Sequence, residues 1–167
     1  HHQPIRIGTD AALALAMCKV IIDAGLYQKR FVQEQTDLPL LVRKDTGHFL
    51  RGSEINDGDR DDQFYWWDSM TGSLTPAPRH TLALVGIDPA LEGSFEVETL
   101  AGHVTVRPVF ERLRAEVAPW TPEAASRVCG TPQSHPAEWK AFTSEGSFEA
   151  ARMPRPPPPA AALISTG

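Results

Sequence analysis

A helix with no charged residue over most of its length constrains the fold of this chain more than any other feature. Residues 11–18 carry no charge, and the apolar side chains in and around them recur at helical spacing. These side chains are Leu13, Met17, Val20, Ile21 and Ala24. The alanines between them leave no polar face, and a helix that is apolar all round is typical of a protein core. We therefore expect a buried helix that ends at Gly25, in the position usual for a C-terminal cap.

The residues before this helix predict a strand and a tight turn. Pro4 to Ile7 is predicted as a short strand and Gly8 as the turn, so that the helix begins at Thr9 or Asp10. The Thr9 side chain can cap the first N–H groups, and the Asp10 carboxylate lies at the positive end of the helix dipole. Such a unit can present N–H groups and a carboxylate to a nucleotide-like ligand. An ordinary capped helix explains the same residues, and such caps are common.

Short helices and β-hairpins are predicted after this unit. A second helix spans residues 27–35, with Tyr27, Phe31 and Val32 facing inward, and an extended segment follows at 38–42. The other predicted elements are a polar loop at 52–63, hairpins at 64–78 and 95–107, an irregular segment at 82–93, and helices beginning at Pro108 and Thr121. The predicted fold class is therefore α/β, with a strand–turn–helix start followed by β-hairpins and short helices.

Two parts are expected along the chain, a folded part, 1–129, and a divergent, Pro-rich tail, 130–167. The proline run at 154–159 favours extended polyproline II and cannot join a packed helix. We expect this tail to be disordered. The alternative is that Pro156 to Pro159 form a recognition peptide for an aromatic-lined groove.

Charge and cysteine usage exclude several function classes. The net charge of −5 argues against a nucleic-acid or anionic-membrane partner, and no apolar run is long enough to cross a bilayer. Cys18 and Cys129 are not in a Cys-x-x-Cys spacing, so they cannot build a zinc or iron–sulfur site alone. Cys18 is expected as a small core residue of the buried helix. The chain has neither a nucleophile motif such as Gly-x-Ser-x-Gly nor a phosphate-binding loop.

Three local features allow both a functional and a structural interpretation. The aspartates of the polar loop suggest a calcium site, but the downstream glutamate of such a loop is missing, so a solvated loop is favoured. The aromatic run 64–67 is a possible ligand platform, although packing of the hairpin is the simpler explanation. His103 is expected as a solvated turn residue rather than a metal ligand. The aspartates concerned are Asp57, Asp59, Asp61 and Asp62.

Several segments resemble the molybdopterin oxidoreductases of the dimethyl-sulfoxide-reductase type. Residues 4–16 read P-I-R-I-G-T-D-A-A-L-A-L-A, similar to the family segment P-I-R-P-G-T-D-x-A-L-A-L-A, with Ile7 in place of the usual proline. Residues 41–51, L-V-R-K-D-T-G-H-F-L-R, resemble a second family segment that lies well outside the turn. The similarity continues through 95–123 and ends near Gly130.

The resemblance implies a part of the larger molybdopterin oxidoreductase fold. In that family the Gly-Thr-Asp turn contacts the guanine nucleotide of a bis(molybdopterin guanine dinucleotide) molybdenum cofactor, so Gly8, Thr9 and Asp10 are implied as cofactor contacts. The family's iron–sulfur cysteines and its molybdenum ligand lie upstream of the matched segment, so no catalytic residue and no metal ligand is expected in this chain. The remaining catalytic polypeptide, and an iron–sulfur electron-transfer subunit, are the implied partners.

The implied function is a contribution to a molybdenum-dependent oxidoreductase, with no activity in the isolated fragment. The chain begins at His1 with the strand-like run almost at once, which favours an internal segment of a longer polypeptide. The alternative is a small α/β binding or interaction protein without a cofactor, in which the capped helix is structural. The sequence does not indicate the substrate. It does not indicate the compartment, periplasm or cytoplasm, either, because an export signal would lie outside this segment.

Overall fold

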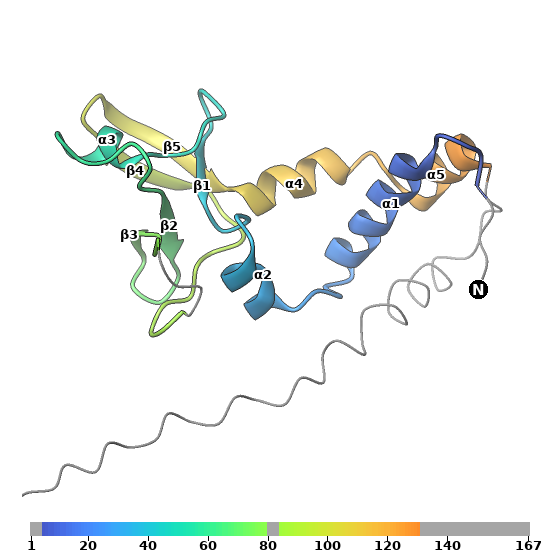
Figure 1. The fold of residues 1–167 in the computed structure, drawn as a ribbon, viewed down its shortest axis with the longest axis horizontal. Helices are drawn as coiled ribbons and strands as arrows, with labels where there is room; N and C mark the ends of the chain where they lie inside the picture. The colour runs from blue at the N-terminus through green and yellow to red at the C-terminus, as the bar shows by residue number, and fades with distance from the viewer. Residues whose placement is uncertain (1–4, 80–83, 131–167) are drawn as a thin grey trace, which may run out of the picture.

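A computed structural model describes residues 5–79 and 84–130, and the structural statements below concern these residues. Figure 1 shows a β-rich end and a helical end, with helix α4 running between them. In chain order the elements are α1 (Asp10–Asp23), α2 (Lys29–Gln35), β1 (Leu41–Arg43), α3 (Gly52–Ile55), β2 (Tyr65–Asp68), β3 (Ser73–Pro76), β4 (Phe95–Thr99), β5 (Gly102–Pro108), α4 (Val109–Val117) and α5 (Pro122–Cys129). Pro4 and the proline run at 154–159 lie outside the described residues, so the predictions made for them stay predictions.

Two antiparallel sheets form the β-rich end. β5 is the central strand of a three-stranded sheet in the order β1-β5-β4, and β2 pairs with β3. Val97 and Val106 point to the inner face and are buried. Glu96 and Thr105 pair across the outer face, where the Thr105 hydroxyl donates to the Glu96 carboxylate at 2.6 Å. The predicted hairpins at 64–78 and 95–107 are both confirmed, since β2 pairs with β3 and β4 pairs with β5. Side chains alternate between the two faces of each strand, as the sequence pattern indicated.

The inner face of the three-stranded sheet packs against β2. The indole of Trp67 stacks on the ring of Phe95, with centroids 4.4 Å apart and planes 6° from parallel. Tyr65 is buried beside them, so the packing interpretation of the aromatic run is confirmed for these two positions. The buried cluster consists of Leu41, Leu50, Tyr65, Val97 and Val106.

The helices are joined to this end by a second apolar cluster. Phe110 of α4 packs with Val32 of α2 and Leu91, and its ring centroid lies 5.2 Å from that of Tyr27. At the helical end, where α1 and α5 lie side by side, Ala16 packs on Ala125. None of the helices in the described ranges is long and apolar enough to cross a bilayer.

Most helix boundaries agree with the sequence predictions. α1 begins at Asp10, and Gly25 follows it with φ +63°, a conformation that favours glycine. α5 begins after Thr121, whose hydroxyl accepts a hydrogen bond from the Ala124 N–H at 3.2 Å. The mixture of helix and strand agrees with the predicted class in its coarse form. The larger fold around it stays a prediction.

Three predictions about the N-terminal unit are wrong. Residues 5–7 form no strand, because the Arg6 N–H donates to the Cys129 carbonyl at the end of α5 rather than to a neighbouring strand. Thr9 does not cap α1, since its hydroxyl donates to the Arg6 carbonyl at 2.7 Å. Cys18 is exposed rather than buried, because α1 packs on other elements along one side only.

Two smaller predictions also need correction. Phe31 was expected to face inward, but it is 57% exposed, because α2 turns Val32 and Gln33 toward the molecule instead. The polar loop at 52–63 begins with a helical turn, α3, in which the Glu54 carboxylate accepts from the Arg51 N–H at 2.9 Å. The rest of that loop contains neither helix nor strand, as predicted.

A buried carboxylate ties the β2–β3 hairpin to the loop that precedes β4. Asp68 is 2% exposed and accepts hydrogen bonds from the N–H groups of Asp88 and Met70 at 3.1 and 3.0 Å. The Thr71 hydroxyl donates to it at 2.8 Å. These donors lower the pKa of Asp68 below its ordinary value, the Asp88 N–H first among them. The Asp88 carboxylate itself accepts a hydrogen bond from the Gln33 amide of α2 at 2.6 Å, so the hydrogen bonds around Asp68 connect to α2.

We predict that Asp68→Asn destabilises the chain at neutral pH, because an amide N–H₂ would face backbone donors. The folded pKa is depressed, so the stabilisation by the carboxylate is complete above the unfolded pKa of about 3.9 and is lost as the pH falls through the folded value. Urea unfolding at a series of pH values should therefore show a gap between wild type and variant that narrows below about pH 4. Asp57→Asn, at an exposed loop position, is the control without effect. A gap that stays constant down to pH 2 would contradict the assignment.

Candidate functional site

The Gly8-Thr9-Asp10 turn lies at the N-terminus of α1, at the helical end of the molecule (Figure 1). Gly8 has φ +81°, and a Cβ built on it would meet no atom within 4 Å. The chain can reverse there because glycine adopts positive φ without strain. The Thr9 N–H and hydroxyl both donate to the Arg6 carbonyl, at 3.3 and 2.7 Å, which closes the turn.

The C-terminus of α5 holds this turn in place. The Arg6 N–H donates to the Cys129 carbonyl at 2.9 Å, and the Cys129 thiol donates to the Thr9 carbonyl at 3.3 Å. Gly130 follows with φ +72°, and a Cβ there would approach Arg6 Nε to 2.9 Å. The Arg6 side chain thus lies directly against the end of α5. Two contacts between positions more than a hundred residues apart therefore position the three residues of the predicted site.

The turn leaves its polar groups accessible. Among the described residues no side chain caps α1, and the first intrahelical bonds run from the Ala12 and Leu13 N–H groups to the Thr9 carbonyl. Asp10 is exposed, and within the described ranges no ion pair or hydrogen bond engages its carboxylate. A helix N-terminus with free N–H groups, a neighbouring carboxylate and no Cβ at the turn can bind a ligand that carries both acceptors and donors. The structure thus brings Gly8, Thr9 and Asp10 together, and their role as cofactor contacts stays a prediction.

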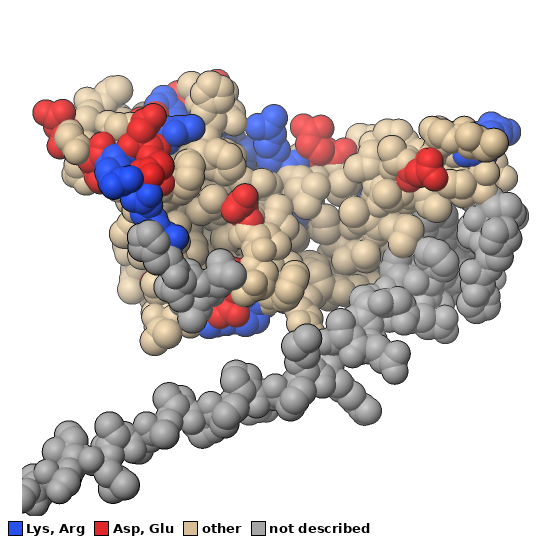
Figure 2. Space-filling view, viewed as in Figure 1, with Lys and Arg blue, Asp and Glu red and all other residues tan. Residues whose placement is uncertain are grey.

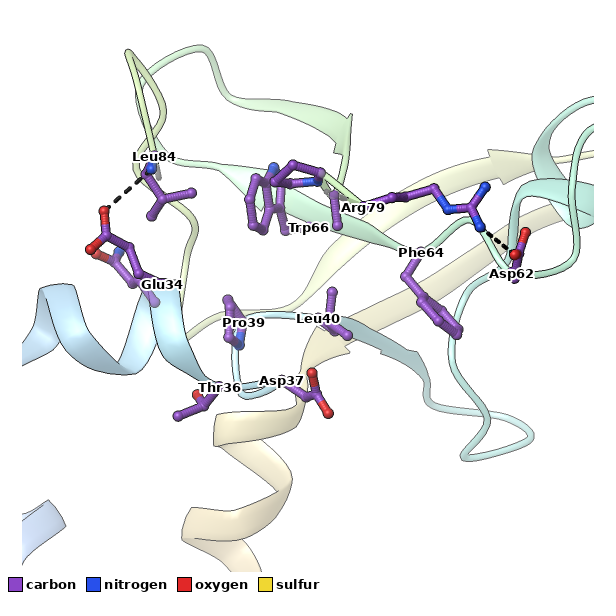
Figure 3. Close-up of a pocket in the computed structure, with 13 residues that line it drawn as sticks. Glu34, Thr36, Asp37, Pro39, Leu40, Asp62, Phe64, Trp66, Arg79 and Leu84 are labelled. Carbon is purple, nitrogen blue, oxygen red and sulfur yellow. Dashed lines mark hydrogen bonds and ion pairs between the residues drawn. The ribbon is translucent and has the colours of Figure 1, made fainter. Parts of the chain in front are cut away.

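A cavity of about 280 Å³ lies at the β-rich end, between the α2–β1 connection and the β2–β3 hairpin (Figure 3). Its apolar walls are Pro39, Leu40, Phe64, Trp66 and Leu84, among others. Phe64 and Trp66 alternate with the core residues Tyr65 and Trp67, because successive side chains of a strand point to opposite faces. The aromatic run was the one sequence signal for this cavity. None of Gly8, Thr9 or Asp10 lines it.

Most charged residues around this cavity are engaged with one another or with backbone, whereas no described residue engages the Asp37 carboxylate. Arg79 pairs with Asp62, and the Glu34 carboxylate accepts from the Leu84 N–H at 3.2 Å (Figure 3). Trp66 is 4% exposed, and its buried Nε1–H has no acceptor among the residues that the structure describes. The cavity therefore offers an apolar volume with few free polar groups.

The aspartates of the loop at 52–63 are used mainly in local contacts. Asp62 pairs with Arg60 at 2.9 Å, and Asp61 accepts from the Ser53 hydroxyl at 2.6 Å. The Tyr65 hydroxyl approaches Asp59 at 3.4 Å. Figure 2 shows this mixture of acidic and basic side chains over the α3 end of the molecule. Among the residues that the structure describes, no three His, Cys, Asp or Glu side chains are grouped so that they could hold a metal ion.

Three curated relatives illustrate what this chain is similar to. It is 45% identical over 133 residues to dimethylsulfide dehydrogenase subunit alpha of Rhodovulum sulfidophilum, a match that covers 76% of this chain and 14% of that protein. It is 42% identical over 140 residues to chlorate reductase subunit alpha of Ideonella dechloratans, covering 80% and 15%. It is 41% identical over 131 residues to respiratory nitrate reductase subunit alpha of Haloferax mediterranei, covering 70% and 13%. No family model matches the chain.

These matches cover most of this chain but only a small part of each relative. The chain spans between 13% and 15% of the length of the three subunits. The three relatives are named for different substrates, and all three are alpha subunits of oxidoreductases.

The closure of the turn can be tested by Thr9→Val, which keeps the shape of the side chain and removes the hydroxyl donor. We expect a loss of about 0.5–1.5 kcal/mol in the free energy of unfolding, because the Arg6 carbonyl loses one of its two hydrogen bonds. Thr9→Ser retains the donor and should lie close to wild type. Urea denaturation measures both variants. A destabilised Thr9→Ser together with a Thr9→Val as stable as wild type would mean that the methyl group, rather than the hydroxyl, matters.

Proposed function

The chain is a segment of the catalytic subunit of a molybdopterin oxidoreductase of the dimethyl-sulfoxide-reductase type, and we propose that its Gly8-Thr9-Asp10 turn forms part of the pocket for the guanine nucleotide of the cofactor. The observation that carries this proposal is the unengaged Asp10 carboxylate beside the uncapped N-terminus of α1. The relatives are molybdoenzyme subunits, so the alternative of a cofactor-free binding protein is not favoured.

The chemistry of the turn fits a guanine nucleotide. Guanine presents two N–H donors on one edge, at N1 and at the exocyclic N2, and a carboxylate can accept both in charge-assisted hydrogen bonds. Asp10 is the first residue of α1 and is exposed, so its carboxylate can meet a ligand without breaking an internal contact.

The neighbouring groups suit the phosphate or ribose of the same nucleotide. The N–H groups of the first turn of α1 lack side-chain caps, and such groups bind anions. Gly8 lets the backbone approach a ligand closely, since open space surrounds the position where a Cβ would stand. The Thr9 hydroxyl already donates to Arg6, so in this arrangement it can only accept from a ligand. Ile7, which is fully exposed beside the turn, offers an apolar contact surface.

In the whole enzyme the molybdenum of the cofactor would supply the redox chemistry, and residues of this chain would bind and orient the nucleotide end. The bis(molybdopterin guanine dinucleotide) form of the cofactor and an iron–sulfur cluster bound elsewhere are parts of this proposal. An iron–sulfur electron-transfer subunit is the proposed further partner. The fragment alone is expected to be inactive, because the family resemblance puts the molybdenum ligand and the iron–sulfur cysteines upstream of the matched segment. The relatives' names include dimethylsulfide, chlorate and nitrate, so they do not select one substrate.

We predict that Asp10→Asn lowers cofactor binding in the full-length subunit. The substitution replaces one acceptor oxygen by an N–H₂ donor that faces a guanine donor, at a cost of about 1.5–3 kcal/mol. The expected result is a reduced molybdenum and pterin content per purified subunit, measured by elemental analysis and pterin fluorescence. Asp10→Glu keeps both acceptor oxygens and should do less harm.

Asp23→Asn is the matched control, because Asp23 is an exposed acid at the other end of the same helix and pairs with Lys19 at 2.7 Å. It should leave the cofactor content unchanged. Full cofactor loading of Asp10→Asn together with a lowered melting temperature would assign Asp10 to the start of the helix alone. In that case the proposed nucleotide contact would be wrong.

A further inference from the structure

The cavity at the β-rich end is lined mainly by rings and aliphatic side chains (Figure 3). Phe64 and Trp66 form one wall, and Pro39 and Pro78 contribute two further rings. Among the described residues, few polar groups at these walls are free to pair with a peptide. Proline has no backbone N–H, so a proline run can lie against such walls without burying an unpaired donor.

One negative charge at the cavity lacks a partner among the described residues. Glu34 pairs with Arg30 at 2.6 Å, and Asp62 pairs with Arg79. No described residue engages the carboxylate of Asp37, which is exposed between α2 and β1. Figure 3 shows Asp37 on the α2–β1 side of the cavity. An occupant that complements this cavity therefore combines an apolar body with a positive charge.

The chain itself carries a segment with this chemistry. Residues 154–159 read P-R-P-P-P-P, and Arg152 and Arg155 are the only charged side chains from 150 to 167. A proline run favours polyproline II before it binds, so docking costs little conformational entropy. The residues between Gly130 and Pro154 can span up to about 75 Å, several times the radius of gyration of about 14 Å expected for a chain of this size. The tail is therefore long enough to reach the cavity from the end of α5.

We propose that the cavity is a polyproline-recognition site that binds residues 154–159 of the same chain, with proline rings against Phe64 and Trp66 and with Arg155 paired to Asp37. The docked tail would connect the β2–β3 hairpin with the α2–β1 connection. The resemblance to the oxidoreductase family ends near Gly130, so the packing expected of the family fold does not include this contact. The docking is also independent of the nucleotide site, because the residues of the N-terminal turn do not line the cavity.

Photocross-linking in the full-length subunit tests where the tail lies. The photoreactive residue p-benzoylphenylalanine replaces Ala160, directly after the proline run. The purified subunit is irradiated, and the cross-linked peptides are identified by mass spectrometry. The expected products join the tail to peptides that contain residues 33–40, 64–66 or 77–79 of the same copy. Cross-links to other parts of the subunit, no cross-links at all, or cross-links found only between two copies would overturn the proposal.

Charge-reversal variants test the ion pair in the same assay. Arg155→Asp should lower the yield of the cavity cross-links about three- to fivefold, because an attraction between exposed charges becomes a repulsion. Asp37→Arg should have the same effect, and the double variant should recover the yield of the wild type. Asp57→Arg is the matched control without effect, because Asp57 is an exposed acid that does not line the cavity. Single variants that cross-link like the wild type, or a double variant that does not recover, would overturn the proposed pairing.

The proline run is tested by the double variant Pro157→Ser, Pro158→Ser. It introduces two backbone N–H groups and weakens the preference for polyproline II, while both arginines are retained. The yield of the cavity cross-links should fall, and the melting temperature of the subunit serves as the control for intact folding. An unchanged yield would show that the prolines do not carry the recognition and would overturn the proposal.

Discussion

The contact between the N-terminal turn and the end of α5 is the constraint on which the candidate site depends. The hydrogen bonds from Arg6 to the Cys129 carbonyl and from the Cys129 thiol to the Thr9 carbonyl join positions far apart in the sequence. They fix where α1 starts and which way its first N–H groups point. Because Ala16 and Ala125 are small, α1 and α5 can pack closely, and this brings their ends together. The geometry of Gly8, Thr9 and Asp10 is therefore a consequence of helix packing as much as of local turn chemistry.

The route from this end to the sheet runs through the start of α4. β5 passes directly into α4 at Pro108 and Val109, and the N–H groups of Val109 and Phe110 donate to the carbonyls of Leu40 and Leu38 at 2.9 Å. Phe110 then fills the second apolar cluster between α2 and the loop before β4. The β2–β3 hairpin, which lines the cavity, and the turn at the start of α1 thus lie at opposite ends of one folded unit (Figure 1). Among the described residues, no hydrogen bond or ion pair directly connects the cavity with the Gly8-Thr9-Asp10 turn.

The sequence predicted elements whose signals are local. The β4–β5 hairpin follows from strict alternation, and α5 from a capping threonine followed by proline. The sequence predictions were wrong where a contact between residues far apart in the chain decides between two local conformations. Thr9 has the right chemistry for a cap, but the bond between Arg6 and α5 places the Arg6 carbonyl within reach of its hydroxyl. The apolar pattern of α1 predicted a buried helix, but only Ala12 and Ala16 are buried, and the apolar residues that carried the prediction, such as Leu13 and Met17, are half-buried. A pattern that is apolar all round cannot specify that Cys18 lies on the uncovered side.

The central claim is that Asp10 and the turn before it contact the guanine of the cofactor. An electron cryomicroscopy structure of the full-length, cofactor-loaded subunit tests this most directly. We expect a guanine edge with its N1 and N2 within about 3 Å of the Asp10 carboxylate oxygens, and nucleotide oxygens at the N-terminus of α1. A guanine edge paired with other residues, while the Asp10 carboxylate faces solvent, would contradict the account.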